Sequence, residues 1–96
     1  MRFAYAISVS TSGAGELVLQ VHAPNAQLVE VDGDLTSWQP QAMQRQAPGR
    51  FRASFPAPDG LARIRLRIDG GAWIAPPGLA SVPDETGGVL GVIPGR

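Results

Sequence analysis

The chain has 96 residues, of which 44% are hydrophobic and 17% are charged. This length fits one folded domain over residues 1–96, and the hydrophobic share excludes a disordered polar chain. Eight arginines balance eight acidic residues, so net charge gives no general attraction to nucleic acid or to an anionic membrane. No window reaches the roughly 20 consecutive apolar residues that a transmembrane helix requires.

The chain lacks cysteine, which excludes a disulfide framework and a thiolate metal site. His22 is the one histidine, and nothing around it suggests a metal centre or a Ser-His-Asp triad, so we expect a surface or edge residue. The first 15 residues do not form a typical signal peptide. The cytoplasm is therefore the default location, and no cofactor or metal is expected.

Glycines and prolines interrupt every apolar run before it reaches the length of a typical helix. Between these interruptions, apolar and polar residues alternate, which is typical of half-buried strands. The predicted strands, in chain order, cover residues 3–9, 17–22, 28–31, 50–55, 62–68 and 89–93. The segment 75–88 is expected to be a long loop stiffened by prolines.

The clearest alternation lies in residues 62–68, where three arginines share the face opposite to three aliphatic residues. Turn-forming residues separate the predicted strands, at Asp32-Gly33-Asp34, Pro48-Gly49, Pro58-Asp59-Gly60 and Asp69-Gly70-Gly71. Short strands at this spacing predict an all-β, immunoglobulin-like sandwich of about seven strands.

Several segments, in a fixed order, carry a resemblance to a known family. They are residues 22–38 (HAPNAQLVEVDGDLTSW), Gly49-Arg50-Phe51, Pro58-Asp59-Gly60, and residues 65–73 (RLRIDGGAW). Together, within residues 17–93, they resemble the family 48 carbohydrate-binding modules. These early-set domains precede the catalytic barrel of glycogen branching enzymes and isoamylases, and the glycogen-binding domain of the AMP-activated protein kinase beta subunit belongs to the same group.

The resemblance implies that one exposed face binds an α-1,4-glucan through two tryptophans and a nearby basic residue. By position these residues are Trp38, Trp73 and Arg65. Thr86 takes the place of a threonine and asparagine pair that bonds the glucan in the kinase-subunit domains, and this chain has no asparagine there. Arg67 occupies a position that is usually apolar in the family.

These residue types suit a sugar. An indole offers a flat apolar plate for the C–H face of a glucose ring, and a guanidinium offers a rigid fork of donors for its hydroxyl groups. Structural roles remain open for all three residues. Trp38 could close the core beneath its turn, Trp73 could cover a sheet edge, and Arg65 could keep a strand face solvated.

For two other groups of charged residues we expect structural roles. Asp32 and Asp34 have the spacing of a carboxylate pair, but Asp-Gly-Asp is common turn chemistry and a turn role is expected. The nearby Arg45, Arg50 and Arg52 lack the interleaved aromatic residues of a nucleic-acid-binding stripe. No activated nucleophile or acid pair is visible, so we do not expect an enzyme.

The sequence therefore predicts a non-catalytic module that binds glycogen or starch, alone or as a targeting subunit for a glycogen-metabolising enzyme. The alternative is an early-set module for protein interaction or self-association that has lost sugar binding. The missing asparagine and the apolar residues 89–93 motivate this alternative.

Overall fold

The computed structural model describes residues 6–11, 15–84 and 88–93. In this part of the chain, ten strands form two antiparallel sheets. The first sheet has the order β1 (Ala6–Thr11), β2 (Glu16–His22), β6 (Arg50–Pro56) and β5 (Gln44–Ala47). The second has the order β4 (Gln41–Ala42), β3 (Val29–Gly33), β7 (Ala62–Ile68), β10 (Val89–Ile93) and β9 (Ala80–Pro83).

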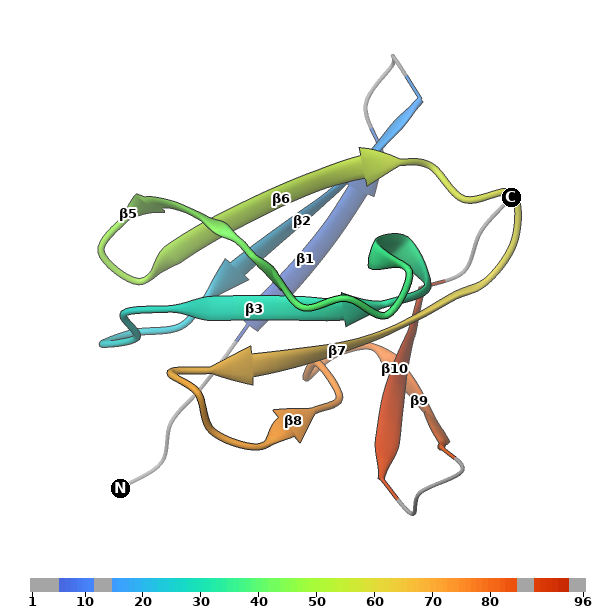
Figure 1. The fold of residues 1–96 in the computed structure, drawn as a ribbon. Helices are drawn as coiled ribbons and strands as arrows, with labels where there is room; N and C mark the ends of the chain where they lie inside the picture. The colour runs from blue at the N-terminus through green and yellow to red at the C-terminus, as the bar shows by residue number, and fades with distance from the viewer. Residues whose placement is uncertain (1–5, 12–14, 85–87, 94–96) are drawn as a thin grey trace.

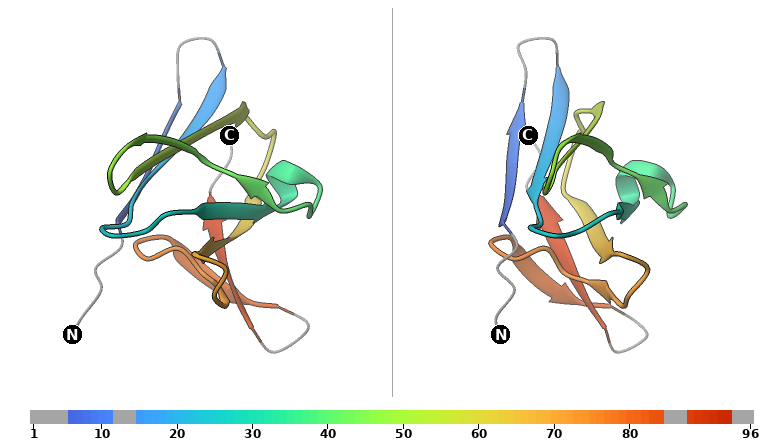
Figure 2. Two further views of the ribbon diagram at one scale, coloured as in Figure 1. Left: turned by 60° about the vertical axis from the view of Figure 1, so that its left-hand side comes forward. Right: turned by 90° about the vertical axis from the view of Figure 1, so that its left-hand side faces the viewer.

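Two short elements complete the second sheet. Strand β8 (Trp73–Ile74) pairs with β7, and the 3-10 helix η1 (Asp34–Thr36) follows β3 directly. Figures 1 and 2 show the two layers, with β1, β2 and β6 in one and β3, β7 and β10 in the other. Among the described residues, no helix has the length and apolar character to cross a membrane.

The strand order confirms the predicted all-β sandwich. Strands β1-β2-β6-β5 follow the A-B-E-D order of an immunoglobulin sheet, and β3-β7-β10 follow the C-F-G order of its partner. Consecutive strands β2 and β3 lie in different sheets, so the connection between them crosses from one layer to the other. This arrangement places β7, with its three arginines, at the centre of the second sheet.

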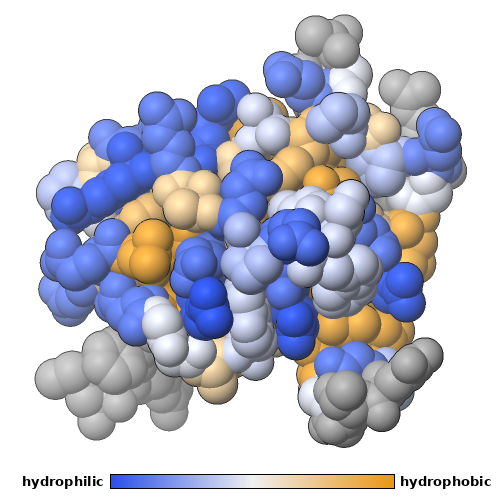
Figure 3. Space-filling model, in the orientation of Figure 1, coloured by the Kyte–Doolittle hydropathy of each residue, from blue (hydrophilic) through white to orange (hydrophobic). Residues whose placement is uncertain are grey.

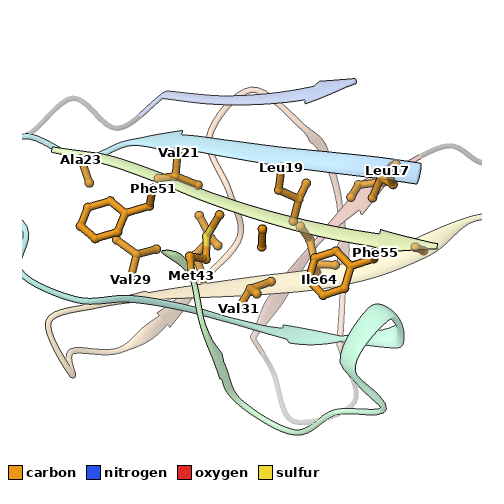
Figure 4. Close-up of a cluster of buried hydrophobic side chains, with 14 of the residues drawn as sticks. Leu17, Leu19, Val21, Ala23, Val29, Val31, Met43, Phe51, Phe55 and Ile64 are labelled. Carbon is orange, nitrogen blue, oxygen red and sulfur yellow. The ribbon is translucent and has the colours of Figure 1, made fainter. Parts of the chain in front are cut away.

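The core lies between the two sheets (Figure 4). The alternate residues of β2, Leu17, Leu19 and Val21, point from one sheet toward Val31 and Ile64 of the other. Leu19, Val31 and Ile64 have no exposed surface. Burying one such side chain stabilises the fold by roughly 1.5–3 kcal/mol, so this layer holds the sheets together.

The structure corrects three expectations about local elements. Residues 80–83, expected within a loop, form β9, and short strands β4, β5 and β8 raise the count from about seven to ten in the described chain. Asp32 lies in β3 and not in a turn, because its backbone pairs with Arg65 of β7. Residues 3–5 of the first predicted strand fall outside the described residues. His22 is exposed, as predicted.

Gly33 gives a direct test of how closely β3 approaches β7. Its φ is +135°, and a Cβ atom there would overlap the Arg63 carbonyl oxygen and lie 2.8 Å from the Ile64 Cα. We expect Gly33→Ala to lower the free energy of unfolding by about 2–5 kcal/mol, from backbone strain and overpacking together. Urea unfolding followed by tryptophan fluorescence measures this change.

Gly70→Ala is the matched control, because Gly70 also has a positive φ (+74°) but has open space around its Cβ position. Its expected cost is about 1–2 kcal/mol, from the left-handed backbone alone. Equal losses in the two variants would show that close packing at Gly33 contributes nothing.

Candidate functional site

Two ion pairs cross the outer face of the second sheet, where β3 and β7 run antiparallel. Glu30 lies opposite Arg67, and Asp32 lies opposite Arg65. Arg65 donates from Nε and Nη2 to the two carboxylate oxygens of Asp32, at 3.0 and 2.6 Å. Arg67 binds both oxygens of Glu30 in the same way, at 2.9 and 3.0 Å. Bidentate pairing fixes the direction of each guanidinium as well as its charge.

A third pair ties η1 to the same strand. Arg63 donates to the carboxylate of Asp34 from its backbone nitrogen at 2.8 Å, and from Nε and Nη2 at 3.1 and 3.2 Å. The Trp38 indole also donates from Nε1 to Asp34 Oδ1, at 3.2 Å. One carboxylate therefore holds both a strand arginine and the first tryptophan.

The backbone around Trp38 is strained. Ser37 and Trp38 have φ of +53° and +61°, in the left-handed region that costs roughly 1–2 kcal/mol for residues other than glycine. The Trp38 amide donates to the Gly33 carbonyl oxygen at 2.8 Å, which closes the loop over η1. The bond from the indole to Asp34 offsets part of this strain, and the loop presents Trp38 on the outside of the sheet.

Trp73 reaches the same face by a different route. After β7 the chain reverses at Asp69 and Gly70, both with positive φ, and Gly71 donates to the Ile68 carbonyl oxygen at 3.0 Å. The returning strand β8 then pairs Trp73 directly with Arg67. Residues directly opposite in antiparallel strands share a face, so Trp73 lies on the arginine side of the sheet.

The arginines of β7 contact the indole rings in an alternating series. The Arg65 Cζ lies 5.6 Å from the centroid of Trp38 and 4.9 Å from that of Trp73. Arg63 lies 5.8 Å from Trp38, and Arg67 lies 4.5 Å from Trp73. These distances are within the range of cation–π attraction. Arg65 thus joins the two tryptophans.

The structure brings together three of the four residues named from the sequence. Trp38 is 39% exposed, which contradicts a role in closing the core, and Trp73 is partly exposed. Arg65 lies between them, with 26% of its side chain exposed. The fourth residue, Thr86, lies outside the described residues.

A groove borders Trp38 on the β10 side. It encloses about 560 Å³, and its lining residues are Trp38, Arg63, Arg65, Val82, Pro83, Asp84 and Leu90. Leu90 lies on the outer face beyond Arg65 but is only 4% exposed. Figure 3 shows this side of the molecule, with a hydrophobic area at the lower right over β9 and β10. The base of the groove is therefore apolar, and its edge carries hydrogen-bond donors and one carboxylate.

Ion pairing sets the charge state of these groups. Hydrogen bonds from Arg63 hold the pKa of the Asp34 carboxyl below its usual value, despite some burial. The Asp32 and Glu30 carboxylates raise the pKa of Arg65 and Arg67 respectively. Arg65, Arg67 and Asp34 therefore stay ionised at neutral pH.

Sequence reasoning missed the acidic half of this face. The signal was present as two alternating triplets, Glu30, Asp32 and Asp34 against Arg63, Arg65 and Arg67. Such triplets pair only if their strands lie side by side in one register, and the sequence did not identify β3 and β7 as neighbours.

Comparison with known proteins adds no relative: the sequence matches no protein-family model and no curated protein.

The Asp32–Arg65 pair is expected to be structurally important, because Asp32 is only 2% exposed. Arg65→Ala would leave this buried carboxylate without its guanidinium, and we expect a loss of about 3 kcal/mol in the free energy of unfolding. Arg63→Ala is the matched control, since the Arg63 side chain is 49% exposed, and its expected loss is below about 1 kcal/mol. Chemical denaturation compares the two, and equal losses would contradict the distinction.

The lowered pKa of Asp34 predicts a loss of stability in acid. Because its pKa is lowered in the folded state, its contribution is complete above the unfolded value of about 3.9 and disappears as the pH falls through the folded value. Asp34→Asn lacks this charge but keeps an oxygen for the Trp38 indole. We expect the variant to be less stable than the wild type at neutral pH and the gap to close between about pH 5 and pH 2. Urea midpoints measured across this range provide the test, and a constant gap would contradict it.

Proposed function

We propose that the outer face of the second sheet binds a linear α-1,4-glucan of the glycogen and starch type. The observation that carries this proposal is the placement of two partly exposed indoles on one face, joined by Arg65 at 5.6 and 4.9 Å from their centroids. Two plates side by side offer stacking surfaces to more than one sugar ring of the same chain. The resemblance to family 48 carbohydrate-binding modules is the reason for choosing an α-glucan among polysaccharides.

Arg65 has the donors that such a ligand needs. A guanidinium has five N–H bonds, and Arg65 uses two of them for Asp32. The other three have no partner among the described residues. Because Asp32 fixes the guanidinium in place, these donors are already oriented, and binding costs little side-chain entropy.

Charge balance favours a neutral ligand over a charged one. Each of the three arginines is paired with a carboxylate, so the face has no excess cation to attract an anionic polymer. Binding through stacking and neutral hydrogen bonds changes little with ionic strength. The expected affinity is modest, since a short glucan gains contact with two indoles against the cost of association.

The proposal includes no catalytic step. Glycoside hydrolysis needs one carboxylic acid that is protonated at working pH, whereas the pKa of Asp34 is lowered and Asp32 is held by Arg65. The described residues contain no group of side chains that could hold a metal ion. A cytoplasmic location and a glycogen-metabolising partner enzyme belong to the same proposal.

The test is retention on immobilised amylopectin, together with titration of tryptophan fluorescence by maltoheptaose. We expect the wild-type protein to be retarded, and Trp73→Ala to lose affinity by about tenfold or more, because an aromatic anchor contributes about 2 kcal/mol. Leu61→Ala is the matched control, since Leu61 is 60% exposed, precedes β7 and does not line the groove beside Trp38. It should bind like the wild type, and retardation should persist at high salt.

Unretarded passage of folded wild-type protein would contradict glucan binding. Loss of retention at high salt would instead point to binding by charge.

One observation favours the second function, a module for protein interaction or self-association. Strand β9 is the outer strand of its sheet, and all four of its residues are exposed. Val82 and Val89 add exposed apolar side chains, at 37% and 47%. An open strand edge can pair with a strand of another chain. Sedimentation would then show a dimer that maltoheptaose does not disturb, whereas a monomer would count against this function.

A further inference from the structure

The opposite face of the sandwich carries a second cavity, on the outside of the first sheet. It has a volume of about 430 Å³ and involves β1, β2, β6 and the end of β5. The polar residues that line it are Ser8, Gln20, His22, Gln46, Arg50 and Arg52. This volume is within the usual range for small-molecule sites.

Strand register explains why these side chains converge. His22 of β2 lies directly opposite Arg50 of β6, and Gln20 lies opposite Arg52. Ser8 of β1 lies next to Gln20 on its other side. Directly opposite residues share a face, so two neighbouring rows of polar groups cross the sheet side by side.

Gln46 also belongs to this set and lies at a β-bulge. The register of β5 against β6 shifts between Arg45 and Ala47, so Gln46 is the extra residue of the bulge. Bulges are frequent beside functional sites. Here the bulged residue is one that lines the cavity.

The charge of the residues that line this cavity is not balanced. Arg50 and Arg52 are two residues apart on one strand, so their side chains leave the same face roughly 7 Å apart. Neither forms an ion pair with a described residue, and no residue that lines the cavity is acidic. The ion pairs of Arg63, Arg65 and Arg67 lie on the other sheet. Two like charges in adjacent positions repel each other, and a bound anion would relieve that repulsion.

We propose that this cavity binds a small molecule through a phosphate group. Two guanidiniums can each offer a planar fork to the phosphate oxygens, and His22 adds a ring N–H donor. Gln20, Gln46 and Ser8 supply neutral donors and acceptors for hydroxyl groups attached to the phosphate. The face exposes no aromatic ring among the lining residues, so it lacks the stacking surface that a single-stranded nucleic acid uses.

The experiment is a titration of the isotope-labelled chain, followed by NMR, with inorganic phosphate and separately with glucose 6-phosphate, at constant ionic strength. We expect saturable shifts at His22, Arg50 and Arg52. The double variant Arg50→Gln/Arg52→Gln should lose affinity by about tenfold or more, because each charge-assisted bond contributes about 1.5–3 kcal/mol. Arg45→Gln is the matched control, since it removes the same charge from a residue outside the cavity, and should change affinity less than about twofold.

Arg52→Lys tests whether binding needs the planar guanidinium or only a positive charge. It keeps the charge but loses the fork, so we expect a clear loss of affinity with unchanged thermal stability. Tighter binding of glucose 6-phosphate than of inorganic phosphate would identify an organic phosphate as the ligand, and the reverse would identify the free ion. Two results would overturn the proposal: no saturable shift with either probe, or equal losses in Arg45→Gln and in the double variant.

Discussion

The paired strands β3 and β7 are the constraint on which the glucan-binding proposal depends. Their register sets each carboxylate opposite one arginine, and the bidentate contacts then fix the guanidiniums as a rigid row. Trp38 and Trp73 belong to separate segments of the chain, and both pack against that row. Without the acids, three adjacent arginines would repel each other and move freely in solvent, and the indoles would have no fixed support. The acidic residues therefore act on the site although none is proposed to catalyse anything.

The two outer faces of the sandwich use arginine in different ways. On β7 every arginine is neutralised, and its remaining function is geometric, as a support for rings and a source of oriented donors. On β6, Arg50 and Arg52 have no acidic partner in the described chain, so charge itself is what they offer to a ligand. A formal net charge of zero for the whole chain conceals this separation. Average composition is thus a poor guide to what either face attracts.

Period-two alternation allowed most long strands to be predicted, because β2, β6 and β7 each bury one face and expose the other. Strands β4, β8 and β9 have at most four residues and exist through pairing with neighbours distant in sequence, so no local pattern revealed them. Trp38, Trp73 and Arg65 could be named as a set from the family resemblance. Their acidic partners, and the bulge at Gln46, depend on register and became visible only in three dimensions.

The spacing of the ion pairs also restricts how the chain can fold. If β7 slipped by one position against β3, its three arginines would turn into the interior, where unpaired cations are very unfavourable. If it slipped by two, one terminal carboxylate and one terminal guanidinium would each lose their counterpart, and the close approach at Gly33 would be lost. Incorrect pairings are therefore penalised at the centre of the second sheet, so the charges that arrange the proposed binding face also select the native alignment from its nearest competitors.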